Sequence, residues 1–169
     1  INPGFGGDLG IVSNPSNTET VTLTINGTVC TFTFVTSIGA TPGNILIQGT
    51  AALTRAALAT FIANPGTTNA NQVAFAGAQL TALGLISSTD DLSANLFIRA
   101  TSATVTTFTG AETMAGGSNA WTANTTKNRL DLLVLNGGSL AIRRGSEAVS
   151  PVVPTPTTGD TVICSVYNI

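Results

Sequence analysis

The chain has 169 residues, of which 43% are hydrophobic, only 8% are charged and none is His. Acid–base, nucleophilic and metal chemistry is built mostly from His, Cys, Asp, Glu and Lys, so this composition argues against an enzyme. We therefore expect no catalytic, cofactor-binding or metal-binding residues. The net charge of −2 and the scattered basic residues argue against nucleic-acid binding. No apolar run reaches the roughly 18 residues of a membrane-spanning helix, so we expect no membrane insertion.

Four segments differ in composition. Residues 1–18 are rich in Gly, Pro, Asn and Ser without a hydrophobic period, which is typical of an arm or a linker. Residues 19–112 combine strand and helix patterns, residues 113–126 form a Gly-rich linker, and residues 127–169 show strand patterns only. The expected fold class is α+β and mainly β: an antiparallel sheet with one or two packed helices, followed by a small all-β module.

The clearest local pattern lies in residues 21–35. Two runs that alternate apolar residues with Thr flank Asn26-Gly27, the preferred pair for a two-residue type I′ turn. This turn predicts an antiparallel hairpin in which Leu23 lies opposite Cys30. One face should belong to the core, and the other should be a Thr-rich surface.

Helix formers follow the hairpin. Residues 51–63 place apolar side chains on one broad side with Arg55 at its polar edge, which predicts a helix on the core face of the hairpin. The helix should end at Asn64-Pro65-Gly66. A second short helix is expected over residues 76–83, with Gly84 as its C-terminal cap.

Short alternating runs predict the remaining strands. Residues 96–101 and 104–109 are expected to pair as a second hairpin. Residues 130–135 and 139–143 flank a Gly-containing three-residue loop, and residues 161–168 form a last strand. A module of about 40 residues buries too little surface by itself, so the C-terminal part should pack on the first module or on symmetry mates.

The two cysteines are interpreted as buried free thiols. Cys30 is in phase with Phe32 and Phe34, and Cys164 is in phase with Val162. A free Cys in such a position behaves as a small hydrophobic residue. A disulfide or a reactive thiol remains the alternative.

Two charged pairs have competing interpretations. Asp90-Asp91 has the residue types of a cation site or of a glycosidase acid pair, but Ser88-Thr89-Asp90-Asp91 is ordinary turn or N-cap chemistry, which we favour. Arg143-Arg144 is an anion-site candidate, but two Arg residues at a strand end are more typical of a solvated edge.

Trp121 is the candidate interface residue. It is the sole Trp and lies in a polar Ser-Asn-Ala context. It could anchor an interface, fill a local core or stack on a sugar. We choose the interface because Trp is enriched at interface hot spots.

Two stretches resemble tail and fibre proteins of tailed bacteriophages. The first consists of VTLTINGTVCTFTFV and PGNILIQGTAALTRAALATFIAN, and the second is NRLDLLVLNGGSLAIRRGSEAVSPVVPTPTTGDTVICSVYNI. The resemblance implies a structural protein of the virion, in a tail fibre, baseplate or collar, that supports host attachment. It also implies assembly in the host cytoplasm, contacts with other virion subunits and a host surface receptor as a partner.

The resemblance and the composition together predict a homo-oligomer, with a trimer favoured and a sixfold ring as the alternative. The alternative function is a bacterial surface adhesin or extracellular structural module. A polysaccharide-degrading tailspike is disfavoured, because repeats of fixed period are absent from the sequence.

Overall fold

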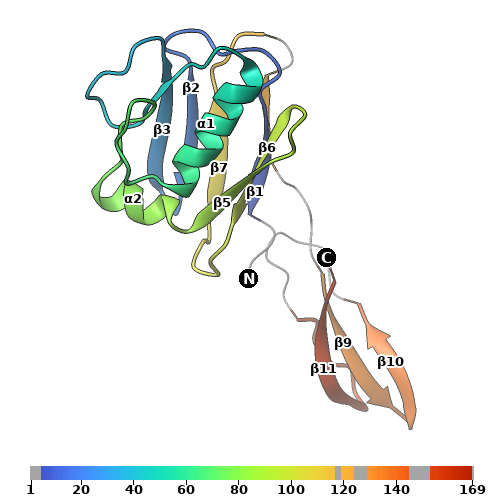
Figure 1. Ribbon diagram of the computed structural model, residues 1–169. Helices are drawn as coiled ribbons and strands as arrows, with labels where there is room; N and C mark the ends of the chain where they lie inside the picture. Colours follow the sequence, from blue (N-terminus) through green and yellow to red (C-terminus); the bar gives the residue numbers. More distant parts are fainter. Residues whose placement is uncertain (1–4, 117–118, 124–128, 145–152, 169) are drawn as a thin grey trace. The chain divides into compact units, whose positions relative to one another are not determined.

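The computed structural model describes residues 5–116, 119–123, 129–144 and 153–168. Its contacts divide the chain into two compact units, unit 1 (Ile1–Asn124) and unit 2 (Thr125–Ile169), each described here by itself (Figure 1). The predicted fold class is confirmed: the described residues are mainly β, with antiparallel sheets and two packed helices, followed by a small all-β unit.

The first sheet of unit 1 is built on the predicted hairpin. Its strands are arranged in the order β4-β3-β2-β7, with these bounds: β2 (Thr20–Ile25), β3 (Thr28–Val35), β4 (Asn44–Leu46) and β7 (Phe108–Glu112). The predicted register is confirmed, since Leu23 pairs with Cys30. Asn26 and Gly27 have φ values of 49° and 81°, as a type I′ turn requires. β4 pairs with β3 in the parallel direction.

The second sheet shows that residues 1–18 are not simply an arm or a linker. Its order is β5-β6-β1-β8, with these bounds: β1 (Gly6–Gly10), β5 (Ile86–Asp90), β6 (Asn95–Ala100) and β8 (Ala120–Ala123). β1 pairs with both β6 and β8, and its Leu9 is fully buried. Glycines dominate β1 and hide its strand pattern. Residues 1–4 lie outside the described residues.

Two further expectations are corrected by this sheet. The predicted hairpin of residues 96–101 and 104–109 does not form, because β6 pairs with β5 and β1, while β7 pairs with β2 of the other sheet. The segment 113–126 is not wholly a linker either, because it contains β8. The boundary between the units nevertheless falls within that segment.

The helices cover the core side of the sheets. α1 (Ala51–Ala63) has the predicted bounds and is capped by Thr50, whose hydroxyl accepts from the Leu53 N–H. In Figure 1 it runs obliquely in front of the strands. α2 (Gly77–Leu83) is also present, but Gly84 at its end has φ −65° and not the left-handed conformation of a Gly cap. Leu80 of α2 is exposed, whereas Ala82 is buried.

Aromatic rings join α1 to the hairpin. The ring centroids of Phe32 and Phe61 lie 5.2 Å apart in an edge-to-face arrangement, and Phe75 contacts both rings. Phe32 and Phe61 have no exposed surface. The predicted packing of the helix on the core face of the hairpin is therefore confirmed.

Arg55 is buried and not at a polar edge. Its side chain is 2% exposed, and its Nε donates to Oδ1 of Asp90 over 2.7 Å. Its Nη1 donates to the carbonyl oxygens of Ile11 and Ser93, each at 3.3 Å. The guanidinium therefore connects α1 to the end of β1 and to the turn between β5 and β6.

Unit 2 is a three-stranded antiparallel sheet. Its order is β10-β9-β11, with these bounds: β9 (Arg129–Asn136), β10 (Ser139–Arg143) and β11 (Asp160–Asn168). The predicted strands are present, but Asn136 pairs with Ser139, so the loop contains two residues, Gly137 and Gly138, instead of three. Both have positive φ, which glycine adopts without strain.

Arg55→Met should destabilise unit 1 by about 3–5 kcal/mol, because the largely buried Asp90 would lose its cationic partner. Arg99→Met is the matched control. The Arg99 and Asp8 side chains are 34% and 41% exposed, so the loss of this ion pair should cost at most about 1 kcal/mol. Denaturant unfolding followed by Trp121 fluorescence measures both. Equal losses in the two variants would contradict the structural role of Arg55.

Candidate functional surfaces

The Asp90-Asp91 pair forms a turn and not a bifunctional acid site. Oδ1 of Asp90 accepts from the Leu92 N–H and from Arg55. Oδ1 of Asp91 accepts from the N–H groups of three residues, namely Ser93, Ala94 and Asn95. The two carboxylates therefore have separate structural partners, as the turn interpretation predicts.

Hydrogen bonds set the titration of Asp91. The backbone N–H of Asn95 has the largest effect and lowers the carboxyl pKa well below its usual range, with further lowering from the Asn95 side chain and Ser93. An acid with a lowered pKa stays ionised at neutral pH. Asp91 is thus suited to hold a turn and unsuited to donate a proton.

Other acidic side chains also form an ion pair or hydrogen bonds within unit 1. Asp8 pairs with Arg99, and Glu19 accepts from the backbone N–H groups of Ser16 and Ala115. Glu112 accepts from a backbone N–H two residues further along. These contacts connect strands and turns within unit 1.

Asp160 has the same role in unit 2. Its side chain is buried and accepts two hydrogen bonds from Arg143, at 2.8 and 2.9 Å, and one from Asn136 at 2.7 Å. The Arg143 hydrogen bond is the main cause that lowers the Asp160 pKa, and it raises the pKa of Arg143. Arg143 is therefore part of an internal ion pair and not simply a solvated edge.

Trp121 lies between the two sheets of unit 1. Its ring stacks on Phe108 of β7 with centroids 5.9 Å apart. A Cβ added to Gly7 of β1 would lie 2.1 Å from the indole, and one added to Gly110 of β7 would lie 2.2 Å from it. The glycines make room for the ring, so Trp121 packs within its own unit. Its contact with another copy stays a prediction.

The two cysteines differ. Cys30 is buried as predicted, and burial raises the pKa of its thiol to about 11. Cys164 is exposed, so that expectation is wrong. Residues 161–165 of β11 are all exposed, and Val162, with which Cys164 was expected to be in phase, is 47% exposed, so that alternation does not mark a buried face. A bulge in β11 also puts Val162 and Cys164 on opposite faces, because Val162 pairs with Val134 and Cys164 with Leu133. Both thiols are free.

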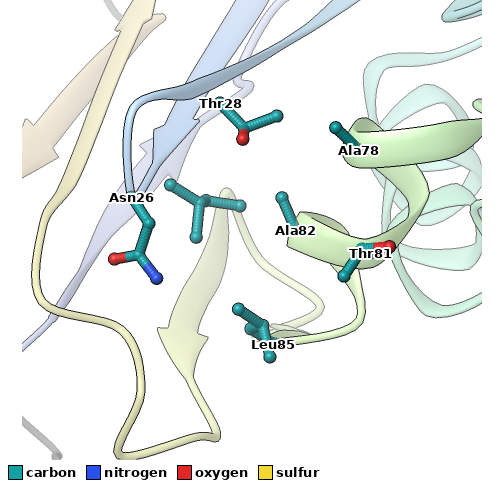
Figure 2. Close-up of a pocket in the computed structure, with 7 residues that line it drawn as sticks. Asn26, Thr28, Ala78, Thr81, Ala82 and Leu85 are labelled. Atoms are coloured by element: carbon teal, nitrogen blue, oxygen red, sulfur yellow. The ribbon is translucent and has the colours of Figure 1, made fainter.

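One pocket of about 280 Å³ lies beside the hairpin turn, as Figure 2 shows. Its lining consists of Ile25, Asn26, Thr28, Ala78, Thr81, Ala82 and Leu85. The Asn26 amide is already bonded to the loop before β7, donating to the Thr104 carbonyl and accepting from Thr106. The pocket has no charged lining and few free polar groups to orient a ligand.

The outer face of the first sheet is rich in Thr, as predicted. The pairs Thr20–Thr33 and Thr22–Thr31 lie across β2 and β3 on the side opposite the core, and the hydroxyls of Thr22 and Thr31 are 3.2 Å apart. Thr109 of β7 continues this face. Among the fully described strands of this sheet, no charged side chain lies on it. We call it the Thr face.

Unit 2 has an apolar face. Strand pairing puts Leu133 and Leu135 of β9 on the same side as Leu140 and Ile142 of β10 and Cys164 of β11. We call these five residues the apolar face. The Arg143–Asp160 pair lies on the other side of the sheet, beside Val134.

The described residues contain no group of three or more His, Cys, Asp or Glu side chains that could hold a metal ion. They also contain no helix of the length and hydropathy needed to cross a membrane. Searches of family models, curated proteins and solved structures found no match to this chain. The resemblance to phage tail proteins therefore stays a prediction.

Gly110→Ala should destabilise unit 1 by about 1–3 kcal/mol through overpacking against Trp121. Gly49→Ala is the control, since its added Cβ meets nothing within 4 Å. In the Trp121→Leu background, adding Gly110→Ala should cost less stability than it costs in the wild type, because the smaller Leu leaves room for the added Cβ. Circular dichroism during urea unfolding measures all four proteins, and a Gly110→Ala variant as stable as Gly49→Ala would contradict this packing.

Asp91→Asn should flatten the acid dependence of unit 1 stability. Because the folded-state pKa of Asp91 is lowered, its stabilisation is present above the unfolded pKa of about 3.9 and is lost as the pH falls. Thermal unfolding from about pH 5 to pH 2, followed by Trp121 fluorescence, measures this slope. Asp160→Asn is the control, because Asp160 lies in unit 2. An unchanged slope in Asp91→Asn would refute the assignment.

Proposed function

We propose that this chain is a non-catalytic structural protein of a virion, a tail fibre, baseplate or collar component of a tailed phage that supports host attachment. It acts as a homo-oligomer, with a trimer favoured over a sixfold ring. The observation that carries this proposal is that the charged side chains form contacts within the chain. Charged side chains form ion pairs and hydrogen bonds within the chain, while the Thr face and the five residues that define the apolar face carry no charge.

The charged groups support a structural role because they have structural partners. Arg55, Arg99 and Arg143 each pair with an Asp, and Asp91 holds a turn. A catalytic acid or base needs a proton-accepting or proton-donating atom free to meet a substrate. Internal pairing leaves these groups to stabilise the fold instead.

The outward surfaces support assembly. Sheet faces without charge favour contact with other protein surfaces, and large exposed apolar patches are typical of interfaces. Subunit contacts at the Thr face and at the apolar face would leave the rest of unit 1 to present or carry an attachment part. The resemblance in the hairpin, helix and C-terminal strands agrees with this arrangement.

The test is an inventory of particles. Virions purified from the source strain by density gradient should contain this chain in a fixed ratio to the major tail protein, in multiples of three or six per tail. Quantitative mass spectrometry across the gradient measures that ratio. An abundant cytoplasmic protein of the host is the control and should be lost on repeated banding. Recovery of the chain only with the host envelope would reject the proposal and favour a bacterial surface adhesin.

A further inference from the structure

The apolar face of unit 2 leaves large side chains uncovered. Leu140 is 67% exposed, Ile142 62% and Leu135 38%. Cys164 beside them is exposed as well. The face extends over all three strands, and the same alternation reaches Asp131, which is buried, at its far end. Such a contiguous apolar patch on a small unit marks an interaction surface.

The small size of unit 2 favours a partner. It comprises residues 125–169 and contains one three-stranded sheet in its described part. Small domains bury a low fraction of their surface, and a unit of this length rarely has enough core to be stable without a metal, disulfide or partner. Cys164 is a free thiol. Covering the apolar face supplies the missing burial.

The chemistry of the face selects its partner. The five residues that define it carry no charge, so neither an acidic nor a basic surface is complementary to them. The exposed large hydrophobic residues of unit 1 lie on different elements or loops: Val12, Val29, Leu53, Leu80 and Leu92. Among the described residues, no strand or helix of unit 1 carries two of them, whereas β10 alone carries Leu140 and Ile142, and a second copy of unit 2 has an identical face.

We infer that the apolar face is the surface through which unit 2 packs against the same face of other copies of this chain. This inference rests on the proposed assembly and identifies its contact surface. Specific interfaces bury about 800 Å² per partner around an apolar centre. The apolar face supplies that centre, and the neighbouring polar strand residues, such as Thr161, supply the rim. In a cyclic trimer or ring each copy contributes the same surface, so the apolar faces of the copies can converge around the symmetry axis.

Cys164 is a built-in reporter of this contact. In the assembled protein its thiol should be covered, and in a separated chain it should be accessible. Cys30 is buried in unit 1 and should stay unreactive in both states until unfolding. The rate of Cys164 modification by an aromatic disulfide reagent, followed by peptide mass spectrometry, therefore measures coverage of the face.

The experiment combines sedimentation with labelling on the 169-residue chain. The wild type should sediment as an oligomer, and its Cys164 should react about tenfold or more slowly than in the separated chain. Leu140→Lys/Ile142→Lys should give monomers with fast Cys164 labelling. Leu53→Lys, at a residue 57% exposed on α1, is the matched control and should remain oligomeric with slow labelling.

Dilution of the wild type provides the same measurement without any substitution. Cys164 labelling should accelerate as the oligomer dissociates, while Cys30 stays protected. The dilution experiment tests the inference even if the Leu140→Lys/Ile142→Lys variant fails to fold.

The outcomes separate the inference from the proposed function. An oligomer whose Cys164 reacts fast, and which survives the double substitution, overturns the inference and leaves the assembly proposal standing. A monomer at micromolar concentration with reactive Cys164 overturns both. A monomer with protected Cys164 shows that the face docks on the chain's own unit 1, which also overturns the inference.

Discussion

The buried guanidinium of Arg55 is the constraint on which the arrangement of unit 1 depends. A charge in the interior is costly unless it is paired and hydrogen-bonded. Arg55 meets this requirement only when α1, the end of β1 and the turn between β5 and β6 are all in place. Its burial therefore couples three segments that are far apart in the chain, and it selects one position of the helix over the sheets.

Trp121 imposes a second, apolar constraint. Its ring lies against Gly7 of β1 and Gly110 of β7, which belong to different sheets. A side chain at either glycine would occupy the space of the indole. The strands near this contact thus have glycine where a strand normally prefers branched or aromatic residues, because close packing outweighs strand propensity there.

Units 1 and 2 differ in how much of their apolar surface they bury. Unit 1 encloses an aromatic and aliphatic core beneath two helices and presents Thr on an outer sheet face. Unit 2 has an internal ion pair on one side of its sheet and uncovered Leu and Ile side chains on the other. The first unit has the burial of a self-sufficient domain, whereas the second leaves large apolar side chains uncovered. This contrast is the basis of the proposed assembly role.

The sequence by itself determined the elements that depend on near neighbours. The hairpin register follows from Asn26-Gly27, and the helix over residues 51–63 follows from local propensity and its stop signal. The turn role of Asp91 also follows from adjacent residues. Only the tertiary structure decided three other features: that β1 and β8 belong to the second sheet, that Arg55 is buried, and that Trp121 packs between the two sheets. Each of these depends on a partner 35 to 116 positions away, and pairing at that distance leaves no periodic trace in one sequence. The sequence feature that could have indicated these contacts was glycine within a strand, which often marks a site of close packing. The exposure of Cys164 could not be read from the sequence either, because its alternation with Val162 indicates a buried face only if that part of β11 is covered, and Val162 itself is 47% exposed.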